Sequence, residues 1–188
     1  MTEKERWIVA RLDEWAGVPR AAPVLGLDGE PLPVFGETLA LAVVAGHPDV
    51  RREGARLRIS TRRPSSSHRV VALLLRWLRA QALAALTPRT AFYAARIGRR
   101  APAVRLSNAE RQWGLCTAEG AIRYSWRLVH LAPPLTDYVI AHEVAHLIEM
   151  NHSKRFWRIV ESLYPQWRDA RARLEREGAG LPLIGRTS

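Results

Sequence analysis

A helix that is apolar on nearly every side constrains this 188-residue chain more than any other segment. Residues 136–150 read TDYVIAHEVAHLIEM, so His142, Glu143 and His146 interrupt an otherwise largely apolar run. A helix of this composition passes through a protein core. Polar side chains buried there cost roughly a few kcal/mol each unless they find partners. The sequence therefore predicts a core that is built around a polar site.

The spacing of the three polar residues indicates what kind of site they form. His142-Glu143-Val144-Ala145-His146 is the HExxH pattern. Residues four apart lie on one face of a helix, about one turn from each other, so both imidazoles can reach a single metal ion. The adjacent Glu143 can reach a water on that ion without being a ligand. The pattern predicts a zinc site with Glu143 as the general base.

A catalytic zinc ion takes three protein ligands and keeps one position open for water. His152 is the best candidate for the third ligand, because it follows the expected helix end at Met150-Asn151, where Asn tolerates the left-handed backbone that turns a chain back. Its spacing matches the HExxHxxGxxH ligand pattern, with Glu149 in place of the usual Gly. Glu149 stays open as a rival ligand or as an acceptor that orients an imidazole. We expect zinc on His142, His146 and His152.

The motifs around these histidines carry a family resemblance. The chain resembles the YgjP-like zinc metallopeptidases, which are related to the SprT-like and WLM groups. The segments that carry it are Arg111 to Thr117 (RQWGLCT), Ile122 to Leu128, Pro134 to His146 and Asn151 to Trp157 (NHSKRFW). The strong match spans roughly residues 104–177. The resemblance implies an α+β, zincin-like catalytic domain with zinc on His142, His146 and His152 and with Glu143 as the catalytic residue.

The remainder of the chain predicts one overall domain in three regions. Residues 1–33 hold a short helix, Lys4 to Trp15, and a Pro/Gly-rich lead-in, and residues 34–64 form a small antiparallel β region. Residues 65–188 form the helical zincin-like metallopeptidase domain. It begins with a long helix from Ser67 to about Ile97, interrupted near Pro88, and continues with paired strands at 104–106 and 121–125.

These features predict a zinc-dependent metallopeptidase whose peptide substrate adds to an exposed strand edge, for which the segment 121–125 is the expected strand. Two other functions remain open. One is a metal-dependent nucleotide hydrolase that holds phosphates with arginines, and the other is a non-catalytic binding module with structural zinc. The candidates for stabilising a transition state are Tyr164, Tyr124, Arg111 and His130, although His130 is expected at the surface or in a loop.

The positive charge of the chain is concentrated in one block. The net charge is +11, and residues 51–100 hold 13 Arg against the single acidic Glu53, which gives them 13 − 1 = +12. A solvated surface that keeps the protein soluble explains this block, and a nucleic-acid surface is the alternative.

Composition and local pattern also bear on the cellular location. The longest strongly apolar runs, 39–45 and 70–75, are far shorter than the roughly 20 residues of a membrane span. Charged residues at positions 3–6 interrupt any signal-peptide pattern. A lone cysteine, Cys116, cannot form an internal disulfide. We expect a soluble cytoplasmic protein with no membrane partner.

Overall fold

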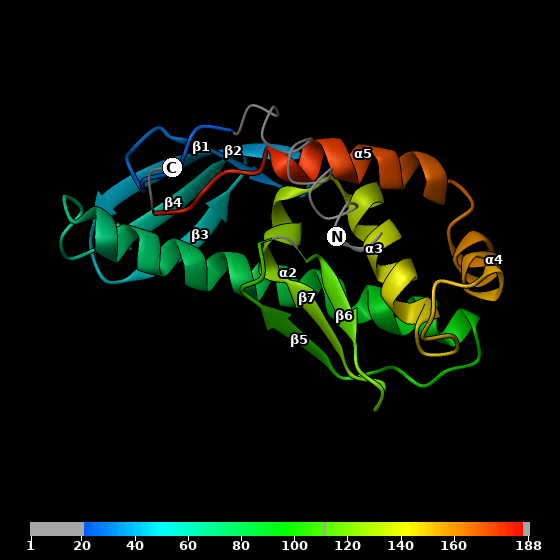
Figure 1. The fold of residues 1–188 in the computed structure, drawn as a ribbon. Helices are drawn as coiled ribbons and strands as arrows, with labels where there is room; N and C mark the ends of the chain where they lie inside the picture. The colour runs from blue at the N-terminus through cyan, green and yellow to red at the C-terminus, as the bar shows by residue number, and fades with distance from the viewer. Residues whose placement is uncertain (1–20, 111, 186–188) are drawn as a thin grey trace, which may run out of the picture.

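The computed structural model describes residues 21–110 and 112–185. The fold is α+β, as expected, with two small sheets and three shorter helices arranged around one long helix (Figure 1). The helix expected at Lys4 to Trp15 lies outside the described residues. One continuous hydrophobic core joins the residues of both sheets to those of the helices.

The first sheet has four strands in the order β1-β2-β4-β3. Its strands are β1 (Pro31–Val34), β2 (Glu37–Ala45), β3 (Asp49–Glu53) and β4 (Arg56–Thr61). It is mixed and not purely antiparallel as predicted, because β2 and β4 run parallel. The reason is that β3, the next strand along the chain, does not pair with β2. Instead β3 and β4 form the hairpin across Gly54, and β4 then lies beside β2.

The long helix α2 (Ser67–Arg96) contains Pro88 without interruption, so the predicted break is wrong. A proline inside a helix removes one backbone hydrogen bond and clashes with the preceding turn. Packing offsets this cost, because one face of α2 is buried from Val70 to Ala94, including Leu86 and Thr90 on either side of the proline. Most of the stability of a helix in a protein comes from such packing.

By length and composition alone, α2 is long and apolar enough to cross a membrane. A core helix of a soluble protein passes the same test, and the buried apolar residues of α2 belong to the common core. The helix is therefore only weak evidence for a membrane span.

The second sheet decides which strand is accessible next to the predicted site. It contains β5 (Val104–Ser107), β6 (Gly114–Cys116) and β7 (Ile122–Ser125) in the order β5-β7-β6. The pairing of the segments 104–106 and 121–125 is confirmed, and it is parallel. Because β7 is central, the expectation that it offers a free edge is wrong. The strand β6, which the sequence analysis did not predict, forms that edge instead.

The helix that carries the HExxH pattern is α3 (Pro133–Ala145). It starts earlier than predicted, since Pro133 and Pro134 occupy its first turn, where a missing N–H costs nothing. It also ends earlier, with His146 as its C-cap. A 3-10 helix, η1 (Trp126–His130), precedes it, and α4 (Lys154–Leu163) and α5 (Trp167–Ala179) follow. In Figure 1, α5 lies along one side of α3 and β6 along the other, and both contacts are close.

Candidate metal centre and active site

The three predicted ligands come together at the C-terminal end of α3. One ring nitrogen from each of His142, His146 and His152 lies within 4.8 Å of the other two. The Nε2 atoms of His142 and His152 are 3.1 Å apart. Two imidazole ligands on a tetrahedral zinc ion lie about 3.3 Å apart, given zinc–nitrogen bonds of about 2.0–2.1 Å. The donor set and its spacing therefore fit a divalent metal ion.

Glu149 contributes its backbone and not its carboxylate. The carbonyl oxygen of Glu149 lies 3.0 Å from Nδ1 of His146, which places the proton on Nδ1 and leaves Nε2 free to bind a metal. The carboxylate of Glu149 instead accepts a hydrogen bond from the backbone of Asn151. Glu149 is not a member of the metal-binding cluster in the structure, so it is an orienting acceptor through its main chain.

The environment of the cluster favours neutral imidazoles. Burial, together with the charges of His146 and His152, lowers the pKa of His142 to about 3. Burial also lowers the pKa of His146 and of His152. Neutral imidazole is the form that binds metals. The Nδ1 atom of His142 is buried and has no hydrogen-bond partner among the described residues.

Aromatic residues of α4 and α5 hold His152 in place. The Ser153 hydroxyl accepts a hydrogen bond from the backbone of Phe156 and caps α4. The ring of Trp157 stacks on the ring of His152 at a centroid distance of 5.9 Å. The ring of Trp167 stacks in turn on that of Trp157, at a centroid distance of 4.3 Å. Phe156 is fully buried against all three imidazoles. These residues serve as core packing and also fix the loop that carries His152.

Glu143 belongs to α3, and its side chain lies against the edge strand β6. Its side chain is buried, with 6% of its surface exposed. The backbone of Cys116 on β6 hydrogen-bonds to its carboxylate. Burial raises the pKa of Glu143 to about 8, and this hydrogen bond opposes that rise. A bound cation also favours the ionised carboxylate, which is the form that accepts a proton.

The other predicted candidates that the structure describes are not members of the metal-binding cluster. The Tyr124 hydroxyl is buried against that of Thr90 at 3.2 Å. His130 is buried and not at the surface as expected, and its Nδ1 lies 2.7 Å from the carbonyl oxygen of Pro33. Tyr164 packs on Tyr138, with 6.2 Å between the ring centroids. The fourth candidate, Arg111, lies outside the described residues.

Arg171 is a charged residue near the centre that sequence reasoning missed. Its guanidinium lies 5.5 Å from the ring centroid of Trp157. Its charge contributes to the lowered pKa of His142 and of His152. It comes from α5, and no spacing relative to the HExxH pattern identifies it in the sequence.

Cys116 is no candidate nucleophile, since burial raises the pKa of its thiol to about 11.

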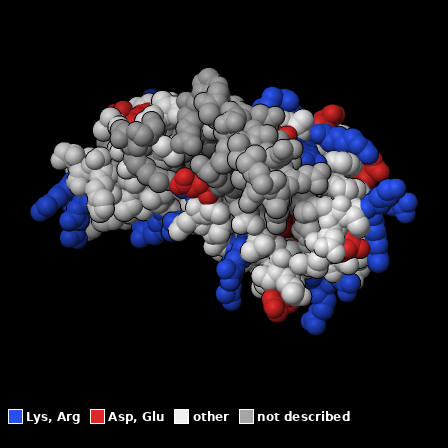
Figure 2. Space-filling model, in the orientation of Figure 1, with Lys and Arg blue, Asp and Glu red and all other residues white. Residues whose placement is uncertain are grey.

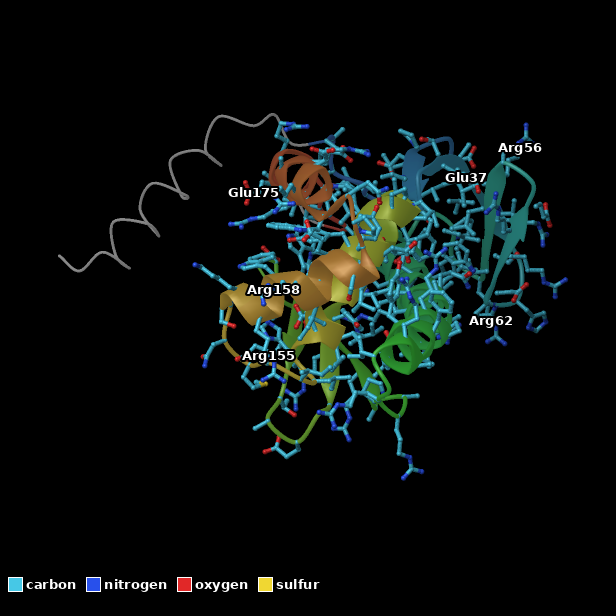
Figure 3. All side chains as sticks on the ribbon, turned by 90° about the vertical axis from the view of Figure 1, so that its right-hand side faces the viewer. Glu37, Arg56, Arg62, Arg155, Arg158 and Glu175 are labelled. Atoms are coloured by element: carbon cyan, nitrogen blue, oxygen red, sulfur yellow. The ribbon has the colours of Figure 1, made fainter. Side chains whose placement is uncertain are left out.

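Part of the arginine-rich block lies away from the metal centre, whereas Arg89 of the same block pairs with Asp137 of α3. Figure 3 shows Arg56 and Arg62 at the opposite side of the molecule from Arg155 and Arg158 of α4. Within the block, Arg51 pairs with Asp49 and Arg52 pairs with Glu37. On the face shown in Figure 2, Lys and Arg project at several separate places and form no continuous patch.

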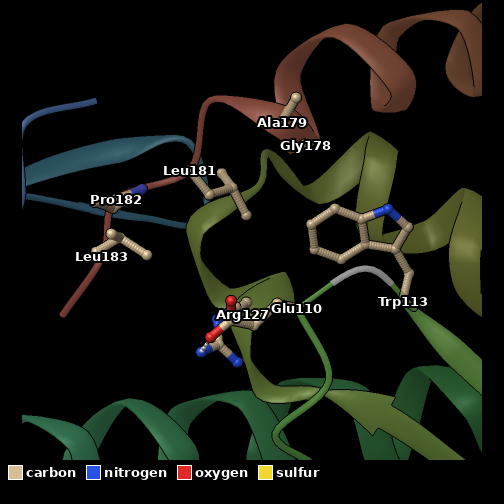
Figure 4. Close-up of a pocket in the computed structure, with 8 residues that line it drawn as sticks. All are labelled: Glu110, Trp113, Arg127, Gly178, Ala179, Leu181, Pro182 and Leu183. Atoms are coloured by element: carbon tan, nitrogen blue, oxygen red, sulfur yellow. Dashed lines mark hydrogen bonds and ion pairs between the residues drawn. The ribbon is translucent and has the colours of Figure 1, made fainter. Parts of the chain in front are cut away.

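A small pocket lies beside Trp113, the residue before β6 (Figure 4). Its other lining residues come from the C-terminal part of the chain, and from Glu110 and Arg127, which form an ion pair at 3.0 Å. The backbone of Gly178 in α5 approaches the Trp113 ring so closely that a Cβ there would lie 2.5 Å from it. The pocket is separate from the three histidines.

Comparison with known proteins gives one match. The family model described as "YgjP-like, metallopeptidase domain" matches residues 1–177, which extends the resemblance well beyond the motifs around the metal centre. The search of curated proteins and the search of solved structures found no match. Metallopeptidases hydrolyse peptide bonds with a bound metal, and the histidine cluster is a place where such a metal can bind. With nearly the whole chain matched and this cluster formed, the protein belongs to the YgjP-like metallopeptidase family.

Proposed function

We propose that the protein is a zinc-dependent peptidase in which His142, His146 and His152 hold the metal and Glu143 is the general base. The observation that carries the proposal is the convergence of three imidazole nitrogens next to Glu143, a buried carboxylate that borders a strand edge. Three neutral imidazoles leave one position of a tetrahedral zinc ion for water, which is the arrangement of a catalytic site.

When bound, zinc polarises the scissile carbonyl and lowers the pKa of the attacking water. Glu143 accepts the proton of that water and donates it to the leaving amine, so the same carboxyl serves first as base and then as acid. The hydrogen bond from Cys116 holds the carboxylate at β6. His146 keeps its ligand nitrogen free because its other nitrogen donates to the Glu149 carbonyl.

The substrate is proposed to bind along β6. One edge of β6 pairs with β7, and no other strand of the described chain pairs with its second edge. An extended peptide adds to such an edge through main-chain hydrogen bonds, which give affinity with little dependence on side chains. Leu115, with 44% of its surface exposed, offers an apolar contact to that peptide.

The structure gives less support to the two alternatives. A nucleotide hydrolase of the expected kind would direct arginines of residues 51–100 at the metal. The arginine whose charge reaches His142 and His152 is instead Arg171 of α5. A structural zinc site is closed by four protein ligands, whereas this cluster offers three.

The test compares wild-type protein with Glu143→Gln on an unstructured protein substrate and on nucleoside triphosphates. The amide keeps the shape of the side chain and removes the base, so we expect bound zinc and a loss of about 10²–10⁴-fold in peptide hydrolysis. Equal cleavage by both proteins would show that Glu143 is not the base. Zinc-dependent release of phosphate without peptide cleavage would favour the nucleotide hydrolase.

The proposed location is the cytoplasm. The single cysteine of the chain, Cys116, is buried and unpaired, as is usual in a reducing compartment.

A further inference from the structure

Gly114 has no conformational reason to be a glycine. It lies in β6, and its backbone is not in the left-handed region that the glycines at Gly54 and Gly120 occupy. Glycine weakens the interior of a strand, because it loses more chain entropy on folding and offers no side chain to pack. Any other residue could adopt the backbone of Gly114, so the reason for glycine must be the space around it.

The Glu143 side chain fills that space. A Cβ atom on residue 114 would lie 2.4 Å from Cγ, 2.6 Å from Cδ and 2.6 Å from Oε1 of Glu143. Real Cβ contacts are not found below about 3 Å, so one of the two groups has to move. The backbone of β6 is held by its pairing with β7, so the Glu143 side chain is the group that has to change its rotamer.

We propose that Gly114 is a positioning residue for the general base, with its missing Cβ forming the space in which the Glu143 carboxylate lies. The same strand also holds the carboxylate directly, because the backbone of Cys116 hydrogen-bonds to it. The inference rests on the proposed function for its catalytic consequence and on the geometry alone for the position of Glu143.

The consequence for Gly114→Ala follows from which group gives way. The added methyl displaces the carboxylate and leaves the three imidazoles unchanged, because none of them is among the atoms nearest to that methyl. A displacement of about 1 Å can cost about 100-fold in rate. We expect kcat to fall by about that factor, with KM changed less than about twofold and one zinc ion still bound.

Two further variants separate positioning from strand stability. Gly114→Val adds the best kind of residue for a strand, so a purely structural role would leave kcat intact, whereas the positioning role predicts a larger loss than in Gly114→Ala. Gly46→Ala is the matched control, since a Cβ there meets Ser60 at an ordinary 3.5 Å. We expect Gly46→Ala to keep wild-type kcat.

The geometry has a test that needs no activity. In the Glu143→Ala background the atoms that crowd residue 114 are absent, so Gly114→Ala should raise the Tm by a few degrees through lower chain entropy in the unfolded state, about the usual effect of such a change. With Glu143 present, the same substitution should give no increase or a decrease. Equal Tm changes in the two backgrounds would overturn the inference, as would full kcat in Gly114→Ala. A wild-type protein that cleaves no peptide but shows the unequal Tm changes would refute the proposed function and support the role of Gly114.

Discussion

The Nε2 atoms of His142 and His152 lie 3.1 Å apart, although the first belongs to α3 and the second follows the end of that helix. Helical periodicity brings His142 and His146 together, but it cannot place His152, since α3 ends at Ala145. The turn after α3 and the capped start of α4 place it instead. The metal centre is therefore made by two helix ends and the loop between them.

The first prediction concerns the ligand set. His142→Ala, His146→Ala and His152→Ala should each lose the bound zinc, because two imidazoles leave the ion without its third protein ligand. Metal analysis of the purified proteins measures this. Glu149→Ala is the matched control and should retain zinc, because its backbone carbonyl, which accepts from His146, is still present. Zinc kept in His152→Ala and lost in Glu149→Ala would transfer the third position to Glu149.

The second prediction concerns the cap of α4. Ser153→Ala removes the hydroxyl that accepts the hydrogen bond from the backbone of Phe156, and it should cost about 1 kcal/mol of stability, as the loss of such a cap typically does. Because His152 directly precedes the cap, zinc affinity should fall as well. Thermal unfolding and zinc titration measure the two effects. Ser153→Asp keeps a capping oxygen and should restore both, so a failure of both to recover would argue against this role of the cap.

The third prediction concerns His130 and pH. Burial lowers the pKa of His130 from 6.5 to about 4. Below about 6.5 the unfolded chain binds a proton there and the folded chain does not, so the free energy of unfolding falls as the pH drops from about 6.5 to about 4. The fall from this residue should reach roughly 3 kcal/mol, at about 1.4 kcal/mol per pH unit.

His130→Asn isolates that contribution. The amide can still donate to the Pro33 carbonyl but does not titrate, so the variant should lose less stability on acidification than wild type. Denaturant unfolding of both proteins with zinc removed measures the difference in stability. The three histidines of the cluster are present in both proteins, so their own titration cancels in that difference. Parallel pH curves would contradict the pKa shift.

The fourth prediction concerns nucleic acid. Three arginines of the block are already held in ion pairs, which favours a solvated surface, so we expect no DNA binding at physiological salt. Nucleic-acid binding would instead appear as an affinity that falls steeply with salt, with a log–log slope of about −0.9 per phosphate contacted on duplex DNA. The measurement uses Glu143→Gln protein with and without six changes to Ser. The substituted residues are Arg51, Arg52, Arg56, Arg58, Arg62 and Arg63. A steep slope that these changes abolish would establish nucleic acid as a partner.

Local spacing in the sequence was sufficient to predict the three histidines that the structure brings together. The helix repeat makes His142 and His146 neighbours whatever the rest of the chain does. The cap at Ser153 is equally local, because its hydroxyl bonds to a backbone group three residues on. The α+β class and the family also follow from the sequence, and both are confirmed.

Only the tertiary structure decided the relations between distant segments. The parallel pairing of β2 with β4, the free edge of β6 and the approach of Gly114 to Glu143 depend on which strands meet, and alternation within a strand does not specify its neighbours. The continuity of α2 through Pro88 depends on burial that outweighs a local penalty. Arg171 reaches the metal centre because α5 packs on α3, a contact that no local pattern encodes.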